Sequence, residues 1–261
     1  MKLKRIASAF LAGALALSLA ACGGSASTSA AASASGSAAG SASAAAGSDL
    51  DYIKGKGKMV IGYTVYEPMN YTDADGNFTG FDTELATAVC EKLGVEPEFV
   101  EINWDTKETE LAAKSIDCIW NGFTYTGREN DYTFSDPYVD NSIVMVVKAD
   151  SGITSLADLA GKSVMAQAAS SAVDAINENE DFKASLKEVV ELGDYNMGFM
   201  DLAQGTVDAV AADLGVAQYQ IANNDGDYVI LDEPLSTEQY AIGFLKGNTE
   251  LRDAVNAELL K

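Results

Sequence analysis

The sequence contains no histidine among its 261 residues. Histidine is the general base of Ser-His-Asp and Cys-His sites and the commonest side chain that binds metal ions. Its absence therefore argues against these classes of enzyme and against most metal sites. We expect a protein with no catalytic residues, no bound metal and no cofactor.

Basic residues are also scarce. The chain has 17 lysine and arginine residues against 39 aspartate and glutamate residues, which gives a net charge of −22. Nucleic-acid binding requires clustered basic side chains, so no nucleic-acid partner is expected. The excess of acid indicates a soluble, self-repelling chain, and the length fits one or two domains with a substantial core.

Long apolar runs are absent except at the N-terminus, where Ile6–Leu19 follows three basic residues in the first five positions. This short apolar segment predicts a signal peptide over residues 1–21 rather than a membrane-spanning helix. Small residues precede Cys22, which resembles the bacterial lipobox, and this resemblance implies that Cys22 becomes the lipidated first residue of the mature protein. The alternative is an ordinary secretory signal followed by an incidental cysteine.

A segment almost wholly of glycine, serine, alanine and threonine follows, over residues 23–48. Such a segment has no large apolar side chains that could form a core. We therefore interpret residues 22–48 as the lipidated cysteine and a flexible tether. The folded part of the protein would then be held outside the cytoplasm, anchored to the outer face of the cell membrane.

Cysteines are few in the rest of the chain, where only Cys90 and Cys118 remain. Outside the cytoplasm the two thiols could form a disulfide. Each lies in an apolar pattern, however, and free buried cysteines are common. Both alternatives stay open.

Predicted strands and helices alternate from about Leu50 onward. Strands are expected at residues 59–62, 99–102, 116–120, 142–147, 163–166, 189–192, 207–211 and 228–231. A helix is expected from Asp82, which could cap it, to Gly94, where it would end. Further helices are expected at residues 108–113, 155–159, 172–177 and 197–203, and another after Asp213 that ends at about residue 221. This alternation predicts an α/β fold with parallel-type sheets built from right-handed crossovers.

The chain also contains a faint internal repeat. Residues 111–119 and 202–210 each combine a helix end, a tight turn and a buried strand with aspartate in its second position. The two copies are about ninety residues apart and each has its own strands, which favours two lobes over one long sheet. We expect residues 49–140 plus 240–261 in the first lobe and residues 141–239 in the second.

Polar and aromatic residues follow four of the predicted strands. In open parallel sheets, ligands bind outside the carboxyl ends of the strands. Taken singly, each residue could be a surface charge, a core side chain or a helix cap. Together they suit a zwitterionic amino acid, because Arg128 could hold a carboxylate and Asp213 could accept from an ammonium. The candidate ligand-binding residues are Tyr66, Asn121, Gly122, Thr124, Arg128, Gln167, Ser170, Ser171 and Asp213.

Several short motifs, in this order and spacing, resemble the polar amino-acid family of bacterial extracellular solute-binding proteins, which are the receptors of ATP-driven importers. The motifs are Tyr66–Met69, Gly76–Phe81, Ile116–Arg128, Phe134–Tyr138, Asp158–Lys162 and Tyr240–Gly247. The resemblance implies a two-lobe periplasmic-binding-protein-like fold of type II, in which two strands join the lobes as a hinge. It also implies a monomer that closes on one amino acid and delivers it to a membrane permease.

The resemblance implies a role for eight of the nine candidate residues. Gly122, through its carbonyl, and Asp213 would hold the ammonium, while Thr124, Arg128 and Ser171 would hold the carboxylate. Tyr66 would lie against the ligand's side chain, and Asn121 and Gln167 would flank the pocket.

The sequence departs from the family in two places. The family usually has two residues between the threonine and the arginine of the clamp, whereas Thr126-Gly127-Arg128 has one, and Gly127 could absorb the shortening. Members also usually continue for another helix or so beyond Lys261.

Two other functions remain as alternatives. The same scaffold could carry an enzyme, such as a dehydratase, which would need a poised acid or base in the cleft. It could also be the sensor module of a receptor. Aromatic residues such as Trp104 suggest an apolar wall for the ligand's side chain, but the sequence leaves the identity of the amino acid open.

Overall fold

The computed structural model describes residues 48–224 and 226–259. The predicted signal peptide and Cys22 lie outside the described residues, and of the predicted tether only Ser48 is described. Across the described ranges, no helix combines the length and the apolar character that crossing a bilayer requires.

A five-stranded sheet, here called the first sheet, has the strand order β4-β1-β5-β13-β6. Strand β1 pairs in parallel with β4 and β5, whereas β13 pairs antiparallel with β5 and β6. The sheet is therefore mixed rather than parallel throughout. Its strands are β1 (Lys58–Tyr63), β4 (Glu96–Glu101), β5 (Cys118–Ile119), β6 (Thr133–Phe134) and β13 (Gly243–Phe244). Associated with it are α1 (Asp49–Lys56), the hairpin β2 (Tyr71–Thr72) and β3 (Phe78–Thr79), α2 (Phe81–Leu93), the 3₁₀ turn η1 (Trp104–Thr106), α3 (Lys107–Ala112) and α8 (Thr249–Leu259).

The second sheet has the order β11-β7-β10-β8-β9, and β12 also pairs with β7. Strand β8 is parallel to β9 and β10, whereas β7 is antiparallel to β10, β11 and β12. Its strands are β7 (Val139–Lys148), β8 (Ser163–Gln167), β9 (Glu188–Leu192), β10 (Ala209–Asp213), β11 (Tyr228–Ile230) and β12 (Ser236–Tyr240). Its helices are η2 (Leu156–Leu159), α4 (Ser171–Glu178), α5 (Glu180–Ser185), α6 (Tyr195–Gln204) and α7 (Leu214–Asn223).

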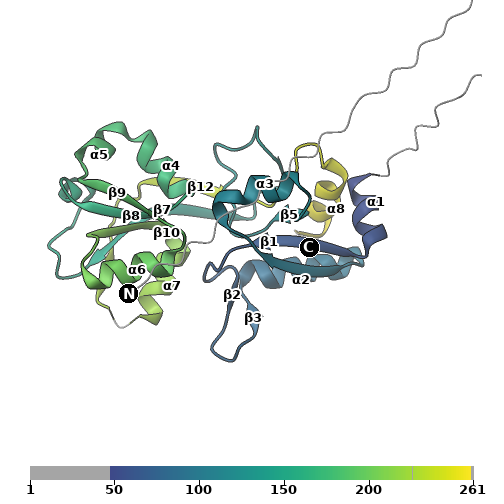
Figure 1. The fold of residues 1–261 in the computed structure, drawn as a ribbon, viewed down its shortest axis with the longest axis horizontal. Helices are drawn as coiled ribbons and strands as arrows, with labels where there is room; N and C mark the ends of the chain where they lie inside the picture. Colours follow the sequence, from purple (N-terminus) through teal and green to yellow (C-terminus); the bar gives the residue numbers. More distant parts are fainter. Residues whose placement is uncertain (1–47, 225, 260–261) are drawn as a thin grey trace, which may run out of the picture. The chain divides into compact units, whose positions relative to one another are not determined.

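Strand β7 shows why the second sheet is covered on both faces. Successive side chains of a strand point to opposite faces. Ile143, Met145 and Val147 pack with residues of α4 and α5, while Val144 and Val146 pack with residues of α6 and α7. Figure 1 shows these two pairs of helices on opposite sides of the sheet. A continuous apolar run is what a strand buried on both faces requires.

The chain passes between the two sheets twice. The first passage runs from β6 into β7, and the second runs from β12 into β13. The passages lie side by side, because β12 pairs antiparallel with β7 from Ser236 opposite Ile143 to Tyr240 opposite Val139.

Both remaining cysteines are free in the structure. Cys90 and Cys118 are fully buried in one apolar cluster of the first sheet. Burial raises the pKa of the Cys90 thiol to about 12 and that of Cys118 well above its ordinary value. The two thiols therefore behave as small apolar core groups.

The expected capping role of Asp82 is wrong. Helix α2 starts after Gly80, with no side-chain cap, and Asp82 lies one residue inside it. Its carboxylate is completely buried and accepts from the Gly122 N–H at 2.6 Å and from the Tyr138 hydroxyl at 2.8 Å. These two buried donors need an acceptor, and Asp82 supplies it instead of capping its own helix.

Burial raises the pKa of Asp82 to about 7 from 3.8, which predicts how stability depends on pH. Between these two values the folded protein holds a proton that the unfolded chain has released. The free energy of unfolding is therefore expected to fall from about pH 4 to about pH 7, by at most about 1.4 kcal/mol per pH unit from this group. Asp82→Asn should flatten the slope. Urea denaturation across this range measures both proteins, and identical slopes would contradict the assignment.

Candidate functional site

The structure brings all nine candidate ligand-binding residues together around one cavity. Trp104 and Tyr195 also line this cavity, here called the central cavity. Its volume is about 20 Å³, which is enough for about one water molecule but too small for an amino acid. An amino acid could enter only if the site first opens.

Asp213 lies at the last position of β10, immediately before α7, and is 5% exposed. Its Oδ1 accepts from Asn141 Nδ2 and from the Tyr240 hydroxyl, both at 2.6 Å. Its Oδ2 accepts from the Tyr195 hydroxyl at 3.1 Å. All three donors are neutral groups. A buried carboxylate whose donors are neutral favours a ligand that carries a positive charge.

A chain of tyrosine hydroxyls connects Asp213 to the first sheet. Tyr66, in the loop after β1, lies 2.8 Å from Tyr240 between their hydroxyl oxygens, and Tyr240 donates to Asp213. The ring of Tyr66 lies 6.1 Å from that of Tyr195. Burial, followed by the charge of Asp213, raises the pKa of all three tyrosines well above the ordinary value. They therefore remain protonated donors.

Arg128 supplies the positive charge of the central cavity. It follows β5 through a loop in which Gly127 has a positive φ of 83°, and its side chain is 15% exposed. Its Nη2 donates to Asp174 Oδ2 on α4 at 2.7 Å, and its guanidinium lies 5.5 Å from the ring centre of Phe123. Despite the shortened loop, Arg128 lines the same cavity as Asp213.

Lys107 is a second buried cation near Arg128, and the sequence pattern does not indicate it. It is 5% exposed, and its Nζ donates to the carbonyl oxygens of Trp104 and Ala169, each at 3.2 Å. Burial, and then the charge of Arg128, lowers its pKa to about 8. Ala169 belongs to the loop between β8 and α4, so this lysine connects the two sides of the cavity.

Ser170 and Ser171 stand at the start of α4. Ser170 occupies the N-cap position, yet its side chain makes no capping hydrogen bond. It is 5% exposed, and its Oγ has no hydrogen-bond partner within the described part of the chain. A buried hydroxyl without a partner is uncommon in proteins. Because Ser170 lines the central cavity, its hydroxyl is available to a ligand there.

Asn121 and Gln167 line the cavity, but their amide groups are already used by the protein. Asn121 donates to the Thr64 carbonyl at 3.0 Å and to Asn70 Oδ1 at 2.7 Å, and its Oδ1 accepts from Thr64. Gln167 donates to the Gly193 carbonyl at 3.0 Å. Both residues therefore hold neighbouring loops in place and present a contact surface to the cavity.

Gly122 is expected to tolerate no larger residue. It has a positive φ of 55°, and an added Cβ would lie 2.7 Å from Cε1 of Tyr66 and 3.1 Å from Cε2 of Tyr240. Gly122→Ala should lower the free energy of unfolding by about 2 to 4 kcal/mol, from backbone strain and overpacking together. Gly127→Ala is the matched control, because φ is also positive there but nothing lies within 4 Å. Urea denaturation compares the two, and equal losses would contradict the close approach.

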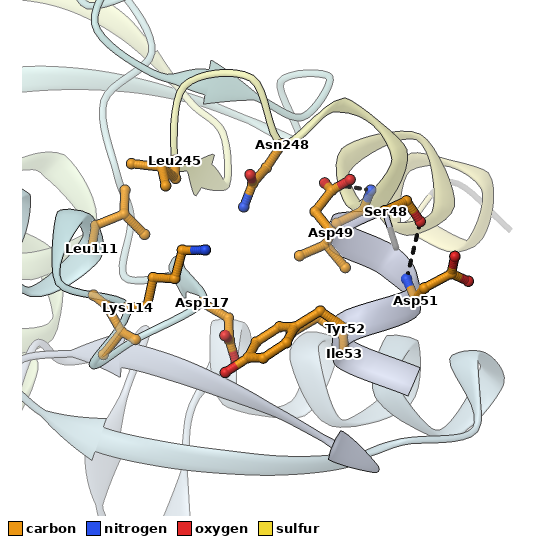
Figure 2. Close-up of a pocket in the computed structure, with 12 residues that line it drawn as sticks. Ser48, Asp49, Asp51, Tyr52, Ile53, Leu111, Lys114, Asp117, Leu245 and Asn248 are labelled. Atoms are coloured by element: carbon orange, nitrogen blue, oxygen red, sulfur yellow. Dashed lines mark hydrogen bonds between the residues drawn. The ribbon is translucent and has the colours of Figure 1, made fainter. Parts of the chain in front are cut away.

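A larger cavity, of about 550 Å³, lies beside α1, α3 and α8. Figure 2 shows Lys114 and Asn248 directed into it and Asp117 at its edge. Asp117 already accepts from Lys56 Nζ and from the Val60 N–H, each at 2.6 Å. None of the nine candidate residues lines this cavity, so the central cavity remains the candidate site.

Comparison with known proteins identifies the family. Residues 59–261 match the model of bacterial extracellular solute-binding proteins, family 3. The chain belongs to this family. It is 33% identical to the L-cystine-binding protein TcyA of Bacillus subtilis, over 79% of this chain and 76% of that protein. It is 34% identical to the arginine-binding extracellular protein ArtP of the same organism, over 78% of this chain and 80% of that protein.

Solved structures agree with this assignment. A substrate-binding protein of an ABC uptake transporter from Streptococcus pneumoniae, with bound histidine, is similar with a TM-score of 0.78 and 34% identity, covering 81% of this chain and 89% of that one. An arginine-bound form of ArgBP from T. maritima gives a TM-score of 0.74 at 34% identity, covering 80% and 98%. The ancestral amino-acid-binding protein AncCDT-1, a precursor of cyclohexadienyl dehydratase, gives 0.74 at 30% identity, covering 81% and 92%.

The predicted α/β fold, a two-lobe periplasmic-binding-protein-like fold of type II, is confirmed by these similarities. The predicted role, the substrate-binding receptor of an ATP-driven amino-acid importer that delivers its ligand to a membrane permease, is confirmed by membership of the family. Such receptors are extracellular or periplasmic proteins.

Proposed function

We propose that this receptor binds one free amino acid in the central cavity, with the α-carboxylate at Arg128 and the α-ammonium at Asp213. The observation that supports it most is that one basic side chain, from the loop between β5 and β6, and one acidic side chain, from β10, line the same cavity. Thr124, Ser171 and the free hydroxyl of Ser170 would add donors at the carboxylate end. The Gly122 carbonyl would accept at the ammonium end.

We further propose that the amino acid has an uncharged side chain. Among the described residues, Arg128 and Asp213 are the only charged ones that line the central cavity, and both are assigned to the backbone groups of the ligand. A charged ligand side chain would then be buried without a partner, which is costly. Tyr66, Trp104 and Tyr195 give this part of the cavity aromatic walls suited to an uncharged group.

Calorimetric titration of the purified protein with the twenty standard amino acids and L-cystine tests both proposals. We expect at least one amino acid with an uncharged side chain to bind, and arginine, lysine, aspartate and glutamate to bind at least about tenfold more weakly. If none of these amino acids binds, the proposed function is wrong. If arginine binds most tightly, the assignment of the ligand's side-chain class is wrong.

We propose that binding closes a hinge between a lobe of residues 49–140 plus 240–261 and a lobe of residues 141–239. The paired strands β7 and β12 would be the hinge, which their antiparallel pairing next to both passages supports. A cavity of about 20 Å³ must open to admit an amino acid. Because Arg128 and Asp213 belong to different lobes, only the closed form satisfies both charges of the ligand, so binding stabilises closure. The closed monomer would be the form that the permease recognises.

We also propose that the chain has no catalytic activity. A similar fold does occur in the ancestry of an enzyme, since AncCDT-1 is described as a precursor of cyclohexadienyl dehydratase. An enzyme of this kind would need a poised acid or base facing its substrate. Asp82 and Glu238 have pKa values raised to about 7, but neither lines the central cavity.

We propose that residues 1–21 are removed as a signal peptide and that a lipid on Cys22 anchors the protein outside the cytoplasm. The lipobox-like sequence and the tether composition support this, and lipidation attaches a folded domain without a spanning helix. Cys22→Ala should release the protein from the cell surface. Its retention on cells to the same extent as the unchanged protein would contradict the anchor.

A further inference from the structure

Glu238 is a buried carboxylate that lies next to the central cavity but has no role in the proposed clamp. It occupies the middle of β12, opposite Asn141 of β7, in the pair of strands proposed as the hinge. It is 7% exposed. Acidic residues are rarely buried unless they have specific partners, so its surroundings indicate what it does.

The partners of Glu238 belong to the proposed ligand site. Its Oε1 accepts from the Thr124 hydroxyl at 3.2 Å and from Asn141 Nδ2 at 2.8 Å. The same nitrogen donates to Asp213 Oδ1 at 2.6 Å. One amide group therefore divides its two protons between Glu238 and the proposed ammonium acceptor. Ser171 lines the same open groove as Glu238, and its hydroxyl lies near enough to lower the pKa of that carboxyl.

A hydroxyl has one proton and can donate it to one acceptor at a time. Thr124 and Ser171 are two of the three hydroxyls proposed to hold the ligand's α-carboxylate. In the structure, the Glu238 carboxylate accepts from Thr124, and the nearby Ser171 hydroxyl lowers its pKa. A charged Glu238 would also repel a second carboxylate placed at the same donors.

We propose that Glu238 competes with the ligand's α-carboxylate for the hydroxyl protons of Thr124 and Ser171, so that binding takes up one proton on Glu238. This rests on the proposed function. The proton comes from solvent and converts the Glu238 carboxylate to a carboxylic acid, which releases both hydroxyls to the ligand. Glu238 thereby makes the affinity of the receptor depend on pH.

The charges that face Glu238 agree with a proton held there near neutral pH. Asp213 on β10 shares Asn141 with it, Tyr240 follows on its own strand, and Tyr195 on α6 contacts Asp213. Burial, followed by the charge of Asp213, raises the pKa of Glu238 to about 7. On its outer side it borders an open groove together with Arg128, Asp131, Asp174 and Glu178, where one cation faces three further acids.

The affinity of the unchanged protein for amino acids is therefore expected to rise on acidification. If the binding-competent form is protonated, and the pKa in the unbound protein is about 7, affinity should increase about tenfold from about pH 8 to about pH 6. The probes are the standard amino acids and L-cystine, without histidine, whose own side chain titrates in this range. Calorimetry at pH 7 in buffers of different ionisation enthalpy should also show proton uptake on binding.

Glu238→Gln mimics the protonated form and should bind about tenfold more tightly than the unchanged protein at about pH 8. Its affinity should also lose most of its pH dependence between about pH 6 and about pH 8. Glu233→Gln is the control, because Glu233 is exposed, and it should keep the pH dependence. Affinity that is independent of pH in the unchanged protein, or proton release on binding, would overturn the proposal. These two measurements need no variant, and an absence of binding at every pH would instead overturn the proposed function.

Discussion

Arg128→Ala is expected to weaken amino-acid binding by about 100-fold or more. The guanidinium offers a planar fork to a carboxylate, and each charge-assisted hydrogen bond contributes roughly 1.5 to 3 kcal/mol, so losing two of them accounts for this effect. The side chain is 15% exposed, so its interaction with the ligand is only weakly screened by solvent. Calorimetric titration with the amino acid that binds the unchanged protein measures the loss.

Two matched variants separate the binding role of Arg128 from its contact with α4. Asp174→Asn removes the ion pair but leaves the guanidinium, and because Asp174 is 58% exposed it should change affinity by less than about fivefold. Arg128→Lys keeps the charge but loses the fork, and should weaken binding by about tenfold. If Asp174→Asn weakens binding as much as Arg128→Ala, the arginine acts by holding the lobes together rather than by holding the ligand.

Asp213→Asn is expected to weaken binding by about 10-fold to 150-fold, the equivalent of one charge-assisted hydrogen bond of roughly 1.5 to 3 kcal/mol. The amide cannot neutralise an ammonium, and it has one oxygen with which to accept from Asn141, Tyr195 and Tyr240. Thermal denaturation without ligand checks that the fold is intact. Calorimetry then measures the affinity.

Asp232→Asn is the control for this prediction, because Asp232 is an exposed acid that does not line the central cavity. It removes one negative charge from an acidic protein and should leave the affinity unchanged. If Asp213→Asn binds as tightly as this control, the ammonium is held elsewhere and the clamp assignment is wrong.

The cavity-lining residues are predictable from the sequence because they occupy a recognisable place in the chain. Gln167 and Asp213 are the last residues of β8 and β10, and Asn121 comes soon after β5. The carboxyl ends of the parallel strands gather at one edge of each sheet. Inspecting the residues at the carboxyl end of each predicted strand therefore collects side chains that lie far apart in the sequence.

Tyr195 could have been found by the same rule, because it comes after β9 (Glu188–Leu192) and opens α6. Lys107 could not. Its sequence pattern is that of an ordinary helix start, and only the packing of Trp104 and the loop at Ala169 buries it. Burial of a charged group depends on tertiary neighbours that local patterns do not encode.

The proposed hinge strand β12 (Ser236–Tyr240) is also not predictable from local pattern. Its sequence, Ser-Thr-Glu-Gln-Tyr, is mostly polar, so it lacks the apolar pattern of a buried strand. It forms because β7 offers it a partner edge, and the buried Glu238 accepts from Thr124 and Asn141. For the same reason the local pattern at Asp82 wrongly indicates a helix cap, since the donors that it accepts from belong to Gly122 and Tyr138.

A crystal structure of the protein with its bound amino acid tests the central claim most directly. The account predicts the ligand in the central cavity, with its α-carboxylate about 3 Å from the guanidinium of Arg128 and its α-ammonium about 3 Å from the carboxylate of Asp213. A ligand bound in another cavity, or in this one with its ammonium away from Asp213, would contradict the account.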